Sequence, residues 1–324
     1  MRLYSIIFLA TILFSLSCHR KEQKTTEADK EKVEEINVPE FDQDSAYNYI
    51  SQQLSYGARV PNTEAHRKCA DYLWTKMNKY ADTVIIQKTQ VRAYNNTLLQ
   101  IKNIISSFNP DSKTRIMLCT HWDSRPFADK DPDKSNHTKA VPAANDGASG
   151  VAVLMEIARN LKNSPLKIGI DLIFLDAEDY GTYNKDDSWG LGSQYWAKNP
   201  HIYGYSARYG ILLDMVGAAE ATFYMEEYSM TYAPDVVRKI WNMAEILGYS
   251  DYFINRQIGP ITDDHYFINK YSKTPTIDII HYDYSEHNGF FKYWHTLKDD
   301  INAIDKKTLK AVGQTLLEVI YREQ

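Results

Sequence analysis

Short apolar runs alternate along this chain with segments of helical period. Four of the runs are dense in apolar residues and short enough for strands buried on both faces: residues 115–119, 167–175, 209–213 and 276–280. Two further segments, 83–92 and 97–106, show the β-branched enrichment of strands. Because strands buried on both faces are typical of parallel sheets, the pattern predicts a mostly parallel sheet covered by helices.

Apolar residues at helical spacing predict the helices that cover this sheet, over residues 62–80, 148–161, 235–247 and 304–321. Asn62 or Thr63 can cap the first of them. No internal repeat and no boundary to a second domain is visible. We therefore expect residues 38–324 to form a single catalytic α/β domain of three layers, near the upper size for one core.

The first residues predict export from the cytoplasm. Residues 5–17 form an apolar stretch after a short basic start, too short to span a bilayer and typical of a secretory signal. Cys18 follows small residues, as in bacterial lipoprotein signals, where the cysteine is lipidated. We expect a signal peptide over 1–17, a flexible tether over 18–37, and a location in the periplasm or at the outer membrane. A soluble periplasmic protein is the alternative.

The net charge narrows the choice of partners. The chain has 37 basic and 42 acidic residues, a formal charge of −5, and removal of Arg2 with the signal leaves −6. This mild acidity without a basic run argues against a nucleic-acid partner, and the lipid on Cys18 is the only membrane contact expected. Cys69 and Cys119 lack the spacing of a zinc site, and we expect two buried free thiols in preference to the alternative, a disulfide between them.

Acidic residues and histidines stand directly after the predicted strands. Asp176 to Asp179 follow the strand over 167–175, and Asp214 follows the strand over 209–213. Ligands bind parallel sheets at the carboxyl ends of the strands, where these side chains converge. A catalytic zinc ion takes three imidazole or carboxylate ligands and keeps one position open. With Asp146, Asp263 and His295 from the intervening loops, the sequence predicts a zinc site at this edge.

Each of these residues also has a simpler structural interpretation. Asp146 can cap the helix that follows, Asp263 can cap another helix, and Asp179 can be a solvated turn residue. A lone His295 would most often be a surface or core histidine. The adjacent Glu178 and Asp179 can divide two roles, since one carboxylate can bind metal while the other transfers protons. The residues alone leave open which of the two carries the proton.

Together these motifs resemble the secreted zinc-dependent glutaminyl cyclases, a family within the zinc aminopeptidase superfamily. The similarity extends from residues 56–61 to the final helix. It is carried by His121-Trp122-Asp123-Ser124, Ala144-Asn145-Asp146, Asp176-Ala177-Glu178-Asp179, Leu212-Leu213-Asp214-Met215-Val216-Gly217, Asp263-Asp264-His265 and Trp294-His295-Thr296. The resemblance implies one zinc ion per chain, held by Asp146, Asp179 and His295.

The same resemblance implies the reaction and the remaining site residues. Glu178 would carry the proton, Asp214 and Asp263 would support the reaction, and Trp294 and Phe290 would line the substrate pocket. The substrates would be peptides and proteins with N-terminal Gln, converted to pyroglutamate with release of ammonia. Separately from the resemblance, we expect a monomer. A pocket histidine of the animal enzymes matches Asp278 in this chain, and the family often has Glu at the position of Asp179.

Two other functions fit part of this pattern. A zinc aminopeptidase with one or two zinc ions would hold its second ion with His121, Asp146 and Asp214, all of which are present. A peptide-binding protein that has lost turnover would keep the fold, but no predicted site position carries an apolar replacement. Trp294 directly before His295, and the run of residues 212–217, favour the cyclase.

Overall fold

The computed structural model describes residues 36–323 of the chain. The predicted signal peptide and all but the last two residues of the predicted tether lie outside the described residues. Within the described part, no helix has both the length and the apolar character needed to cross a membrane. In chain order the elements are α1 (Gln43–Leu54), α2 (Glu64–Tyr80), β1 (Thr83–Arg92), β2 (Leu98–Phe108), β3 (Arg115–His121), the 3-10 helix η1 (Lys134–Asn136), α3 (Ala148–Asn163), β4 (Gly169–Leu175), η2 (Asp186–Ser188), α4 (Leu191–Lys198), β5 (Gly210–Asp214), β6 (Phe223–Met225), α5 (Glu227–Tyr232), α6 (Pro234–Ile246), β7 (Phe253–Gln257), α7 (Asp264–Tyr271), β8 (Thr276–Ile280), η3 (Ile301–Ala303) and α8 (Lys306–Tyr321).

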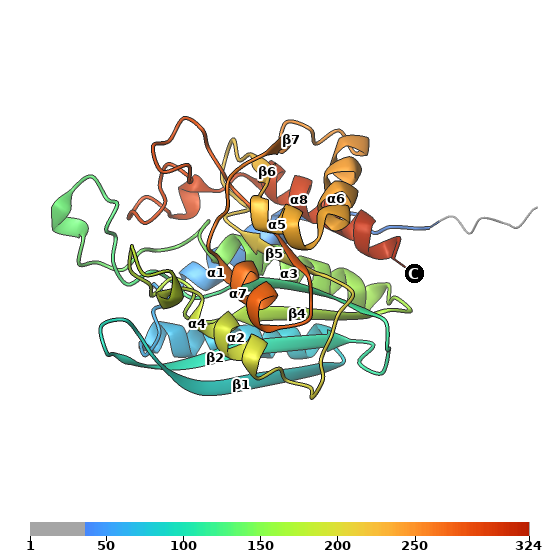
Figure 1. Ribbon diagram of the computed structural model, residues 1–324, viewed down its shortest axis with the longest axis horizontal. Coiled ribbons are helices and arrows are strands. Elements are labelled where there is room, and N and C mark those ends of the chain that lie inside the picture. Colours follow the sequence, from blue (N-terminus) through green and yellow to red (C-terminus); the bar gives the residue numbers. More distant parts are fainter. Residues whose placement is uncertain (1–35, 324) are drawn as a thin grey trace, which may run out of the picture. The chain divides into compact units, whose positions relative to one another are not determined.

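Six strands form the central sheet in the order β1-β2-β4-β3-β5-β8, with helices on both of its faces (Figure 1). The pairs β4-β3, β3-β5 and β5-β8 are parallel, whereas β2 runs antiparallel to both β1 and β4. Five of the six strands therefore point the same way. The prediction of a mostly parallel sheet between helical layers is confirmed.

The central strands are buried on both faces because their side chains alternate between two apolar layers. Every residue of β3, β4, β5 and β8 is buried. On β4, Leu172 and Phe174 face the large core beneath α1, α2, α3 and α8, while Ile173 faces a smaller core. The smaller core includes Trp196 of α4 and Ile268 of α7. Near-continuous apolar strands are the expected result of this double coverage.

Every predicted strand and helix is present, with ends within two residues of the prediction. The first predicted helix begins at Glu64 because Asn62 has a left-handed backbone, with φ of 76°, and cannot continue a helix. Thr63 caps it by accepting a hydrogen bond from the backbone N–H of His66. Cys69 on α2 and Cys119 on β3 are buried free thiols, as predicted.

The sequence pattern did not predict α1, α4, α5 and α7 or the small parallel sheet of β6 and β7. Most of these are short, and α1 buries only Ala46, Tyr49, Ile50 and Gln53. A helix with so few apolar positions gives a weak periodic signal. Asp42 nevertheless fixes its start by accepting hydrogen bonds from the backbone of Asp44 and Ser45.

Candidate functional site

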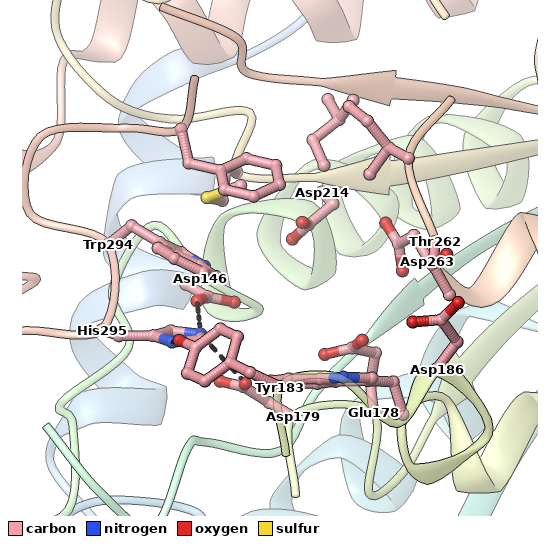
Figure 2. Close-up of a pocket in the computed structure, with 15 residues that line it drawn as sticks. Asp146, Glu178, Asp179, Tyr183, Asp186, Asp214, Thr262, Asp263, Trp294 and His295 are labelled. Carbon is pink, nitrogen blue, oxygen red and sulfur yellow. Dashed lines mark hydrogen bonds and ion pairs between the residues drawn. The ribbon is translucent and has the colours of Figure 1, made fainter. Parts of the chain in front are cut away.

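All eight predicted site residues line one cavity of about 650 Å³ (Figure 2). The sheet delivers some of them, since Asp214 ends β5 and two others follow β4 directly. The other residues lie in the loops that directly precede α3, α7 and η3. The eight residues are Asp146, Glu178, Asp179, Asp214, Asp263, Phe290, Trp294 and His295.

The backbone is strained where it presents these side chains. Ala177, Met215 and His295 all have left-handed backbones, with φ between 51° and 56°. A non-glycine residue in this region costs on the order of 1–3 kcal/mol and persists only where surrounding contacts impose it. Each of the three is a site residue or lies next to one. The fold therefore supports sharp turns that direct polar groups into the cavity.

Asp146, Asp179 and His295 form a compact group of buried donors. The Nε2 atom of His295 lies 3.1 Å from Oδ1 of Asp179 and 3.6 Å from Oδ2 of Asp146. Ligand atoms of the three residues all lie within 4.8 Å of one another. Oδ2 of Asp146 and Oδ2 of Asp179 are buried and accept no hydrogen bond. Because unpaired buried carboxylate oxygens are costly, and imidazole with carboxylates is a zinc donor set, a zinc ion fits this group.

The capping interpretation fails for Asp146, the surface interpretation fails for Asp179 and His295, and the capping interpretation holds for a fourth residue. The side chain of Asp146 makes no capping hydrogen bond to α3, whose N-cap is Gly147. Asp179 and His295 are each 1% exposed, so neither is a surface residue. Asp263, by contrast, does cap α7, with its Oδ1 accepting from the backbone N–H of the next residue.

Gly147 has a steric reason to be glycine. Its φ of 100° is unfavourable for any side chain, and an added Cβ would lie 2.9 Å from Cε1 of His121 and 3.0 Å from the carbonyl oxygen of Asp123. The close approach lets Asp146 enter the cavity from the turn before α3.

Two further carboxylates hold the backbone of the donor loops. Asp299 accepts from the N–H of Asn145 at 2.7 Å and from the N–H of Asp146 at 3.0 Å. Asp123 accepts in the same way from Glu178 at 3.0 Å and from Asp179 at 3.3 Å. These contacts fix both loops from behind. Outer-shell contacts of this kind orient metal ligands and tune their affinity.

The imidazole of His295 is oriented from two sides. The hydroxyl of Tyr183 lies 3.1 Å from its Nδ1 atom, and the ring of Trp294 stacks on it with centroids 3.7 Å apart. Burial, together with the nearby Arg125 guanidinium, lowers the pKa of His295 well below its usual value. The ring is therefore neutral, which is the form that binds a metal ion. Its Nε2 faces Asp146 and Asp179.

Glu178 stands on the cavity wall beside the donor group but makes no ion pair with it. Burial raises the pKa of its carboxyl well above the ordinary value, and the charge of Asp263 adds to this effect. A carboxyl whose pKa is raised toward neutrality can accept a proton and return it within one reaction cycle. The adjacent carboxylates thus have different surroundings. Asp179 lies within the donor group, whereas Glu178 lies outside it on the cavity wall.

His121 sits between carboxylates on the other side of Asp146. Its Nε2 atom lies 3.0 Å from Oδ1 of Asp146 and 3.2 Å from Oδ1 of Asp214. Burial alone would lower the pKa of His121, but hydrogen bonds to Asp123, Asp146 and Asp214 outweigh it and raise the pKa well above its usual value. His121 thus connects Asp146 to Asp214 through its Nε2 atom. Ligand atoms of His121, Asp146 and Asp214 also lie within 4.8 Å of one another.

Asp278 lies on β8 and is not one of the residues that line the cavity. Burial, with the charge of Asp263, raises the pKa of Asp278 well above its usual value. His265 lies beside it, with Nδ1 3.5 Å from Oδ2 of Asp278 and Nε2 3.0 Å from Oε2 of Glu226. Asp278 is thus part of the buried surroundings of the site.

Several cavity residues were not predicted from the sequence. Most of them lie in irregular loops, where no periodicity marks them, whereas Ile280 ends β8 and Asp186 begins η2. These residues are Tyr183, Asp186, Trp189, Met215, Ile261, Thr262 and Ile280.

The sequence matches the model of peptidase family M28 over residues 103–320. Among solved structures, glutaminyl cyclase of Bacteroides thetaiotaomicron bound to N-acetylhistamine is 51% identical, with a TM-score of 0.87, and the match covers 89% of this chain and 100% of that one. A Zn-dependent exopeptidase of Parabacteroides distasonis is 50% identical, with a TM-score of 0.87 and coverage of 89% and 100%. The glutaminyl-peptide cyclotransferase of Gloydius blomhoffii is 28% identical over 245 residues, or 66% of this chain. The match spans 63% of that relative's own length.

Proposed function

The chain belongs to peptidase family M28, and on this premise we propose that it is a zinc-dependent glutaminyl-peptide cyclotransferase. The observation that carries the proposal is the single cavity that holds a zinc-type donor group, a separate Glu178 and an aromatic wall of Phe290 and Trp294. The similarity to a bacterial glutaminyl cyclase over nearly the whole described part supports the cyclase over the aminopeptidase alternative. The substrates would be peptides and proteins that begin with Gln.

The reaction closes a ring within one residue. The α-amine of the N-terminal Gln attacks the carbon of its own side-chain amide, the new C–N bond forms the lactam, and the old C–N bond breaks to release ammonia. A bound zinc ion supplies Lewis-acid polarisation of that amide. Because the nucleophile is tethered, the protein mainly has to hold the side chain folded back, and such orientation can lower a barrier by about 7–11 kcal/mol.

The residues of this chain divide the remaining tasks. Glu178 takes a proton from the attacking amine and returns it to the leaving nitrogen, so the carboxylate is restored at the end of the cycle. Asp214 and Asp263 line the same cavity and would orient the leaving nitrogen through hydrogen bonds. Phe290 and Trp294, with ring centroids 4.6 Å apart, would pack against the methylene groups of the folded side chain.

We propose one zinc ion per chain, held by Asp146, Asp179 and His295. The Nε2 atom of His121 lies 3.0 Å from Asp146 and 3.2 Å from Asp214, and these direct contacts support a single ion held by the other donor group. Metal analysis of the purified protein should therefore give about one zinc per chain. Removal of zinc with a chelator should abolish ammonia release from a peptide with N-terminal Gln, and added Zn²⁺ should restore it. A value near two would contradict the single-ion assignment, and full activity without metal would contradict the function.

The aminopeptidase remains the second candidate because the donor group of His121, Asp146 and Asp214 is intact. In that case the same cavity would position a water molecule against the first peptide bond of the substrate. A peptidase would release the first amino acid, whereas a cyclase would leave the peptide bond intact.

We further propose that the protein is exported and anchored by a lipid on Cys18, as a monomer in the periplasm or at the outer membrane. The basic start, the apolar stretch over 5–17 and the small residues before Cys18 support this proposal. The Cys18→Ala variant should move from the membrane fraction to the soluble exported fraction, with unchanged activity. Wild-type protein found in the soluble fraction would instead favour the periplasmic alternative.

A further inference from the structure

The wall of the cavity is strongly acidic. No lysine or arginine lines it, and its only histidine is His295. Two of its carboxylates belong to the zinc-type donor group, and three more belong to the proposed catalytic set. The remaining one is Asp186. The six carboxylates are Asp146, Glu178, Asp179, Asp186, Asp214 and Asp263.

Asp186 differs from the other five in its surroundings. It is exposed, and its side chain forms no hydrogen bond or ion pair with any residue in the described part of the chain. Its backbone is nevertheless held, because its carbonyl accepts from the N–H of Trp189 at 3.3 Å. The hydroxyl of Ser188 also stabilises the loop, since it accepts a hydrogen bond from the N–H of Thr182 and donates one to the carbonyl of Lys185. A free carboxylate on a fixed loop therefore stands at the solvent-exposed part of the cavity.

In the view of Figure 2, Asp186 and Asp263 lie opposite Trp294 and His295, and Glu178 lies between the two sides. The position of Asp186 bears on the part of the substrate that follows the N-terminal Gln. If the proposed function holds, the α-amine faces Glu178. The α-carbon carries both this amine and the carbonyl group that leads to the second residue. The second residue belongs to the rest of the peptide and leaves through the solvent-exposed part of the cavity, where Asp186 lies.

We propose that Asp186 recognises the residue that follows the N-terminal Gln and favours Lys or Arg over Asp or Glu at that position. The inference rests on the proposed function and adds a substrate preference to it. A cationic side chain would pair with the free carboxylate, while an acidic one would be repelled by it and by the other carboxylates of the wall. Because the pair is solvent-exposed, the effect should be moderate, about three- to tenfold in the ratio of the two specificity constants.

The test compares kcat/KM of the zinc-loaded enzyme for the amidated peptides Gln-Lys-Ala, Gln-Ala-Ala and Gln-Glu-Ala. We expect the order Lys, then Ala, then Glu, with a Lys-to-Glu ratio that shrinks as salt screens the charges. In Asp186→Asn the ratio should fall well below the wild-type value, and in Asp186→Lys it should invert. The matched control is Asp187→Asn, because Asp187 is an exposed neighbour that lines a different cavity with Arg92 and Lys185. It should keep the wild-type ratio.

A ratio that Asp186→Asn leaves unchanged would overturn the assignment of the preference to Asp186. The same fall in Asp187→Asn would also overturn it, since the cause would then be the general charge of the loop. If wild-type enzyme cyclises all three peptides equally, the preference itself is wrong while the proposed function stands. If it cyclises none of them, the proposed function fails and the inference fails with it.

Discussion

Replacing Glu178 with glutamine is expected to lower kcat for cyclisation of an N-terminal Gln peptide by about a hundred- to ten-thousandfold. Glutamine has nearly the same shape but cannot accept the proton of the attacking amine. Because Glu178 is not part of the donor group of Asp146, Asp179 and His295, zinc content should stay at the wild-type value. The measurement is steady-state ammonia release, together with metal analysis of the same preparation.

The pairing of these two readouts isolates the proton-transfer role. A variant that lost zinc as well would place Glu178 among the metal ligands, and near-wild-type activity would remove it from the mechanism. Asp187→Asn again serves as a control, since it neutralises a nearby carboxylate outside the cavity and should change neither readout.

Replacing His295 with alanine should remove zinc and activity together. His295 supplies the only nitrogen of the donor group, and two carboxylates remain after its loss. Polarisation by a metal ion is worth several kcal/mol, so activity should fall on the order of a thousandfold or more. The measurement is zinc content by metal analysis, with activity assayed before and after addition of excess Zn²⁺.

Loss of activity could also follow from misfolding, because His295 has a strained backbone and packs against Trp294. Circular dichroism and the thermal unfolding midpoint, measured for the variant and for zinc-depleted wild type, separate the two causes. The variant should match the depleted wild type. His287→Ala removes an exposed histidine and should keep both zinc and activity. Retention of zinc by His295→Ala would refute its assignment as a ligand.

The parallel core of the fold was predictable because burial on both faces leaves a strong trace in the sequence. β3, β4, β5 and β8 read as apolar runs, and α3 and α8 show apolar residues at helical spacing. The short elements were not predictable. α4 and α7 are eight-residue helices that pack into the smaller core through their own Trp196 and Ile268, and no local pattern reveals this packing.

The chemistry of the site was visible for a different reason. Charged residues directly after buried strands have few structural explanations, and topology alone brings the carboxyl ends of parallel strands together. The supporting contacts were not visible, because they join distant segments. Asp299 holds the loop of Asp146, and Tyr183 orients His295 across 112 positions of sequence. Asp186 was missed because an exposed loop carboxylate carries no local signal until the cavity is known.

The most direct test of the proposed reaction is mass spectrometry of the zinc-loaded protein incubated with Gln-Ala and, separately, with Leu-Ala. Ring closure releases one ammonia, so Gln-Ala should lose about 17 Da while Leu-Ala stays intact. Release of free Leu, with Gln-Ala cleaved and not cyclised, would contradict the account. That result would make the protein a peptidase and assign His121 to a second metal ion.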